Sequence, residues 1–150
     1  MMPLRPHRSQ PTHGRQLSHA EPVEIWKARK FIEQHLAEEL SLTKVAKVVN
    51  ISANYLSEKF KQVTGVNFVD YIVRARFENA THLLEDVDVR ISEIAFAVGF
   101  QSLSQFNRVF KTLSGKSPTE FRGSLRKARK HSEAANRIDD QGETIFRKNA

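Results

Sequence analysis

The feature that most limits how this chain can fold is an internal repeat. The segment LTKVAKVVNISANYLSEKFKQVTG, residues 42–65, aligns with ISEIAFAVGFQSLSQFNRVFKTLSG, residues 91–115, when Gln101 is treated as an insertion. In both copies apolar residues recur at helical spacing, first over a short run and then over a longer one. A repeat of this length predicts one supersecondary unit that the chain uses twice.

Each copy predicts two helices joined by a tight turn. Asn50 and Gly99 occupy the matched turn position, and both residue types tolerate left-handed backbone angles. Ser52 and Ser102 come next and are good N-cap residues for the second helix. The second helix ends at a glycine in each copy, Gly65 and Gly115. The unit is therefore predicted to be a helix-turn-helix motif.

The rest of the pattern predicts helices on either side of the two motifs. Residues 67–86 carry apolar side chains on two faces, which predicts a linker helix. At 1.5 Å per residue it would span roughly 30 Å, close to the roughly 34 Å turn of B-DNA. The predicted fold class is all-α, with two helix-turn-helix subdomains at about 42–64 and 91–114 joined by the long linker helix. Pro22 begins a first amphipathic helix, so the domain is predicted to cover residues 21–126.

Basic charge is concentrated in the two tails. The formal net charge is +7, and residues 1–20 and 122–150 hold the whole excess, because acids and bases balance between them. Residues 1–20 lack apolar periodicity and are predicted to be a disordered basic tail. Residues 127–150 are predicted to be a basic, mostly flexible tail. The charge suggests a polyanionic partner such as double-stranded DNA, although basic tails alone also serve solubility.

The second helix of the second copy is predicted to present a polar face. Its apolar residues, Leu103 and Leu113 among them, are expected to turn inward. The outward side chains are then Ser104, Gln105, Arg108, Lys111 and Thr112. Arginine can bind guanine bidentately, glutamine can bind adenine, and lysine suits a phosphate. Many surface helices carry such residues, but the duplicated context favours base recognition.

The matching helix of the first copy differs in its chemistry. Its outward side chains are Asn54, Tyr55, Ser57, Glu58 and Lys61. An acid, Glu58, thus stands where the second copy has Arg108. Glu58 could accept a hydrogen bond from cytosine N4, or it could pair with Lys59 or Lys61. In the second case the helix would contribute positioning and little sequence information.

With these motifs the chain resembles the DNA-binding domain of the AraC/XylS family of bacterial transcription regulators. The resemblance is carried by YLSEKFKQVTG and by RISEIAFAVGFQSLSQFNRVFKTLSGKSPTEFR. It implies seven helices in two subdomains and two recognition helices that enter successive major grooves. Because the two helices differ in sequence, the site is expected to be asymmetric. The resemblance also implies base contacts from six positions, namely Asn54, Ser57, Glu58, Ser104, Gln105 and Arg108.

The function implied by the resemblance is sequence-specific transcription regulation, with activation through RNA polymerase favoured. The chain leaves no room for a separate small-molecule effector domain. It is therefore expected to be either a short stand-alone member or the DNA-binding remnant of a larger regulator. An alternative is an interaction module that depends on a partner and has weak specificity of its own, and Glu58 keeps this alternative open.

The second helix of each motif is the recognition helix and is called a reading helix. Phosphate contacts are expected from basic side chains on and near the two reading helices. Lys61 and Lys111 lie on those helices. The segment RGSLRKARK, which follows the second motif, is expected to add further contacts. Its candidates are Arg122, Arg126, Lys127, Arg129 and Lys130.

Other chemistry finds little support in the sequence. The chain has no cysteine, which excludes disulfides, thiolate metal ligands and cysteine nucleophiles. His82 and Glu85 are three apart, but two ligands make weak evidence for a metal site. No nucleophile elbow or Gly-rich phosphate loop occurs, so neither an enzyme nor a cofactor is expected. No segment predicts a membrane span or signal peptide, so a cytoplasmic location is expected.

Overall fold

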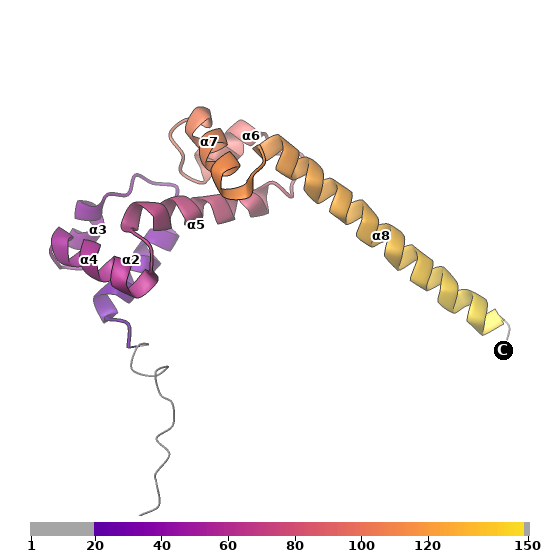
Figure 1. Ribbon diagram of the computed structural model, residues 1–150, viewed down its shortest axis with the longest axis horizontal. Coiled ribbons are helices and arrows are strands. Elements are labelled where there is room, and N and C mark those ends of the chain that lie inside the picture. Colours follow the sequence, from indigo (N-terminus) through magenta and orange to yellow (C-terminus); the bar gives the residue numbers. More distant parts are fainter. Residues whose placement is uncertain (1–19, 149–150) are drawn as a thin grey trace, which may run out of the picture. The chain divides into compact units, whose positions relative to one another are not determined.

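The computed structural model describes residues 20–148, and the side chains of residues 20–137. These residues form seven helices and no strand, as the fold-class prediction requires (Figure 1). The helices are α2 (Val23–Gln34), α3 (Leu42–Val48), α4 (Ala53–Thr64), α5 (Phe68–Leu83), α6 (Ile91–Ala97), α7 (Leu103–Ser114) and α8 (Pro118–Lys148). Residues 1–19, predicted to be disordered, lie outside the described residues.

The chain divides into two compact units. The first unit contains residues 20–34 and 41–68, and the second contains residues 35–40 and those from 69 onward. The first includes α2, α3 and α4, and the second includes α6, α7 and α8. The prediction of two helix-turn-helix subdomains is confirmed. The helix α5 has 16 residues, or about 24 Å, and is shorter than the predicted linker because the helix ends at Leu83.

The turn and cap predictions are confirmed in both units. Asn50 has a φ of 59° and Gly99 a φ of 105°, so both lie in the left-handed region. The Oγ atoms of Ser52 and Ser102 each accept a hydrogen bond, at 3.1 Å, from the backbone N–H three residues further on. These bonds satisfy one of the N–H groups that a helix start leaves without a partner. Each second helix thus begins at a position fixed by one serine.

Aliphatic side chains dominate the core of the first unit. Its buried residues come from all three helices, and Leu56 and Phe60 of α4 have no exposed surface. Phe60 makes an edge contact with Phe68, with ring centroids 5.7 Å apart. The others are Ile25, Ala28, Ile32, Val45 and Ala46.

Aromatic rings dominate the core of the second unit. Phe110 of α7 contacts three other rings, those of Phe77, Phe106 and Phe121, at centroid distances of 4.8, 5.5 and 5.2 Å. Phe106 also contacts Phe100. Among the described residues, the buried set of both units contains no polar or charged side chain. The cores therefore act through apolar burial alone.

The helix α8 differs from the prediction of a flexible tail after residue 126. Its backbone stays helical to Lys148 (Figure 1). A capping box begins it, since the Ser117 N–H donates to Glu120 at 2.9 Å and the Glu120 N–H donates to Ser117 at 3.2 Å. Further on, Arg129 and Glu133 form an i,i+4 ion pair at 3.7 Å. The prediction weighed the polarity of this segment and overlooked its good helix formers.

Candidate nucleic-acid interface

The helix α7 presents the polar face that the sequence predicts. Phe106 and Phe110 are completely buried, and the remaining side chains of the helix leave a broad exposed surface. The exposed residues include Ser104, Gln105, Arg108 and Lys111. Leu103 and Leu113 are both 38% exposed, so they lie at the rim of the apolar face and are not turned inward as predicted.

The charged side chains on this face are positive, and they form only one weak ion pair among the described residues. Arg108 has no ion pair among the described residues, and Lys111 lies 4.0 Å from the Glu120 carboxylate. This pair is exposed on both sides, so it is weak. The hydrogen bond from the Ser117 N–H and the charge of Lys111 lower the pKa of Glu120. Both cations of α7 are therefore available to an anionic partner.

The helix α4 presents its matched face in the same way. Leu56 and Phe60 are buried, whereas Asn54, Ser57, Glu58 and Lys61 are all exposed. The N-terminal turn of the helix is held by Ser52. Two helices with the same caps thus present different chemistry at matched positions.

Glu58 has no ion-pair partner among the described side chains. Of the two open interpretations, pairing with Lys59 or Lys61 is absent within residues 20–137. The carboxylate is exposed on the same outward face as Asn54. Glu58 is therefore exposed and is not neutralised by a neighbouring described side chain.

Two exposed side chains outside the six predicted base readers also belong to these faces. Tyr55 is 42% exposed and aligns with Gln105. Asn107 is exposed and aligns with Ser57. The register of the repeat, continued residue by residue from Ser52 and Ser102, contains the signal that finds both.

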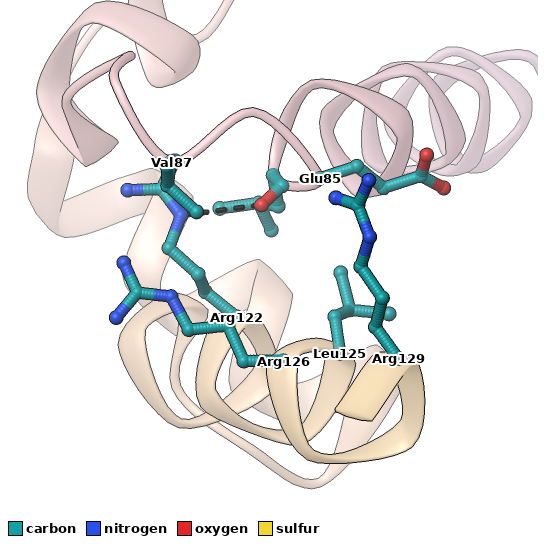
Figure 2. A pocket seen from close by; sticks show the side chains of 7 residues that line it. Glu85, Val87, Arg122, Leu125, Arg126 and Arg129 are labelled. Atoms are coloured by element: carbon teal, nitrogen blue, oxygen red, sulfur yellow. Dashed lines mark hydrogen bonds between the residues drawn. The ribbon is translucent and has the colours of Figure 1, made fainter. Parts of the chain in front are cut away.

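Arg122 has a structural position that the sequence did not predict. Its Nε donates to the carbonyl of Leu84 at 3.2 Å (Figure 2). One terminal nitrogen donates to the carbonyls of Asp86 and Val89 at 3.0 and 2.7 Å. These carbonyls follow the end of α5, where no helical N–H can reach them. The guanidinium therefore joins α8 to this turn, and the phosphate contact predicted for Arg122 stays a prediction.

Arg76 makes a similar clamp elsewhere in the second unit. Its Nε and a terminal nitrogen donate to the carbonyls of Leu36 and Glu38, both at 2.9 Å. Burial lowers the pKa of Arg76 below its ordinary value. When the alignment of the two repeats is continued past Gly65 and Gly115, Arg76 matches Arg126. The residue that repeats the role of Arg76 is nevertheless Arg122, one helical turn earlier.

The other basic residues of α8 up to Arg137 are exposed. Arg126 and Lys127 have no partner among the described side chains. Arg126 lies at the edge of a groove of about 330 Å³ between α8 and the turn after α5, whose lining includes Leu84, Val87 and Leu125 (Figure 2). Arg126 and Lys127 remain suitable for phosphate contacts.

The described residues form neither a metal cluster nor a membrane span. Within residues 20–137, no three His, Asp or Glu side chains gather where they could hold a metal ion. In the described part of the chain, every helix falls short of the length or the apolar character that a membrane span needs.

Comparison with known proteins agrees with this geometry. A family model described as "Helix-turn-helix domain" matches residues 45–124. The Msm operon regulatory protein of Streptococcus mutans serotype c is 34% identical over 94 residues, which cover 63% of this chain and 34% of that protein. The chain thus matches about a third of the length of this relative.

Solved structures give the same answer. The C-terminal domain of AraT, a response regulator from Geobacillus stearothermophilus, matches with a TM-score of 0.67 and 33% identity, over 70% of this chain and 88% of that one. The DNA-binding domain of AdpA, solved in complex with a target DNA, has the same fold, with a TM-score of 0.68 at 24% identity over 71% and 96% of the two chains. The chain therefore belongs to the AraC/XylS family of bacterial transcription regulators and contains that family's helix-turn-helix DNA-binding domain.

Proposed function

We propose that this chain is a transcription regulator that binds an asymmetric duplex site, with α4 and α7 entering successive major grooves. The observation that carries the proposal is the pair of serine-capped helices, each with a buried apolar face and an exposed polar one. The second helix of a helix-turn-helix motif reads base edges in the major groove. Two such helices allow one chain to recognise a full site.

The side chains of α7 suit direct base readout. Arg108 would donate hydrogen bonds to guanine, and Gln105 would pair with adenine. Ser104 would form a hydrogen bond with either base. On α4 the corresponding readers are Asn54, Ser57 and Glu58. Asn107, exposed beside Arg108, joins the α7 face.

Phosphate contacts are proposed from Lys61 and Lys111 on the reading helices, and from Arg126 and Lys127 on α8. Replacing Arg126, Lys127, Arg129 and Lys130 with glutamine should reduce the slope of log affinity against log salt, by about 0.9 for each phosphate that is no longer neutralised. Lys27→Gln with Lys30→Gln on α2 is the matched control and should leave the slope unchanged. An unchanged slope in the α8 variant would contradict the phosphate role.

Activation through RNA polymerase is the direction that membership of the family favours. In vitro transcription from a promoter that carries the selected site tests it directly. Purified chain should raise transcript yield, and a decrease would assign repression.

The decisive experiment for the proposed function is selection from a random duplex library by the whole chain at near-physiological salt. We expect an asymmetric motif with two blocks of sequence information about one helical turn apart. A single block would make one reading helix a positioning element. Salt-sensitive binding without enrichment would favour the alternative function, a partner-dependent interaction module with weak specificity.

A further inference from the structure

The two reading helices differ most at two matched positions. Tyr55 of α4 corresponds to Gln105 of α7, and Glu58 corresponds to Arg108. All four side chains are exposed, and each helix begins at a serine that fixes its first turn. The same two places on the two helices therefore present different chemistry to a base pair.

At both positions, α7 carries a side chain suited to a purine. Arginine donates two hydrogen bonds to the O6 and N7 acceptors of guanine. Glutamine pairs its amide with the N6 donor and N7 acceptor of adenine. Neither pattern is available on a pyrimidine.

At the position on α4 that matches Arg108, Glu58 carries the chemistry suited to a cytosine. A carboxylate only accepts hydrogen bonds, and in the major groove the N4 amino group of cytosine is a donor. Guanine presents only acceptors there and would repel the carboxylate. Because no described lysine neutralises Glu58, the charge remains available for this contact.

At the position on α4 that matches Gln105, Tyr55 carries the chemistry suited to a thymine. Tyr55 is 42% exposed as a residue, on the outward face of the first turn. Its hydroxyl has no hydrogen-bond partner within residues 20–137, so it is not held by the fold. Thymine is the one base with an apolar group in the major groove, the C5 methyl, and an aromatic ring packs against it.

We propose that the reading helices have opposite base preferences, α4 for pyrimidines and α7 for purines. At the two matched positions, each taken in the frame of its own helix, the α4 block contains cytosine and thymine where the α7 block contains guanine and adenine. Tyr55 is thereby a specificity-determining residue for thymine. This inference rests on the proposed function, since it needs both helices to read DNA.

A swap of the two residues tests the inference directly. In library selection, Tyr55→Gln with Glu58→Arg should turn the α4 block into a copy of the α7 block, so that the same block occurs twice in the site. Arg108→Ala identifies the α7 block as the one that loses information. Circular dichroism checks that the variants, all changed at exposed positions, are folded. A swapped protein that keeps the wild-type α4 block would overturn the inference.

A single methyl group tests Tyr55. Replacing the thymine of the α4 block with deoxyuridine removes only the C5 methyl, and affinity should fall about three- to fourfold. Tyr55→Ala should be insensitive to this change, and Tyr55→Phe should respond as the wild type does. If Tyr55→Phe loses as much affinity as Tyr55→Ala, the hydroxyl makes the contact and the thymine assignment is wrong.

A neutral variant tests Glu58. Glu58→Gln should reduce the preference for cytosine over the other bases by about tenfold. Uniformly tighter binding to every sequence would instead mean that Glu58 only repels DNA. Selection with the wild type separates a failure of the proposed function from a failure of this inference. If no block is enriched, the proposed function is contradicted. If two blocks are enriched and both have purines at the matched positions, this inference alone is contradicted.

Discussion

In the second unit, five phenylalanine rings form a connected cluster centred on α7, whereas the buried core of the first unit is mostly aliphatic. The backbones of the two motifs nevertheless use the same devices. Each has a left-handed turn residue, a serine cap and a closing glycine. The comparison teaches that these local devices, and not the identity of the packed side chains, define the motif. Interior and exterior have both diverged around one backbone plan.

The largest effect is expected from the phenylalanine at the centre of the ring cluster. Phe110→Ala removes the packing against three rings and should cost about 5 kcal/mol of unfolding free energy. Phe60→Ala, its counterpart in the first unit, should cost about 3 kcal/mol. Urea unfolding gives the totals, and hydrogen exchange on peptides of each unit locates the destabilised region. Equal costs would remove the energetic difference between the cores.

The next effect concerns the two turn residues. A Cβ on Gly99 would overlap the carbonyl oxygen of Leu36 and lie 2.7 Å from Nε of Arg76, in addition to the strain of a φ of 105°. Gly99→Ala should therefore destabilise the second unit by about 3 kcal/mol. Asn50→Ala, at the matched turn, should cost about 1 kcal/mol, because alanine in the left-handed region carries only local strain. Thermal unfolding distinguishes the two, and equal shifts would show that the close approach at Gly99 relaxes.

A smaller effect should separate two arginines of α8. Arg122→Gln removes charge-assisted hydrogen bonds to three carbonyls and should cost about 2 kcal/mol. Arg126 lies one helical turn further along α8, and Arg126→Gln should change the free energy of unfolding by less than about 0.5 kcal/mol. Urea unfolding compares the stabilities of the two variants, and DNA-binding measurements compare their affinities. If Arg122→Gln left stability unchanged but reduced the salt slope, Arg122 would be a phosphate contact after all.

The smallest effect is a pH dependence at the start of α8. The hydrogen bond from Ser117 and the charge of Lys111 lower the pKa of Glu120 in the folded chain. A lowered folded pKa adds stability above the unfolded value of about 4.3 that is lost as pH falls through the folded pKa. Wild type should therefore exceed Glu120→Gln in thermal midpoint at neutral pH, and the gap should close on acidification. A gap that persists at low pH would assign the effect to packing.

Much of the fold follows from the sequence because its signals are local. Ser52, Ser102, Asn50 and Gly99 act within a few residues, so the repeat alone predicts the turns and caps that the structure contains. The outward faces of α4 and α7 also follow from helical periodicity, and all six predicted base readers are exposed.

What the sequence did not predict depends on longer-range contacts. The role of Arg122 requires carbonyls 33 to 38 residues away in the chain, and no local pattern indicates them. Leu103 and Leu113 were expected inside because apolar residues on a helix were treated alike, whereas a short helix buries only its central stripe. The base contacts themselves belong to a complex, so the sequence and the free structure leave them as proposals.

The apolar character of the buried residues has a consequence for temperature. Within the described chain no polar side chain is buried, so the buried side chains that unfolding exposes are hydrocarbon, and their hydration raises the heat capacity. The free energy of unfolding should therefore form a strongly curved dome against temperature, with a decrease on cooling as well as on heating. Both reading helices depend on these cores for their orientation, and chilling should weaken their support before any contact with DNA is changed.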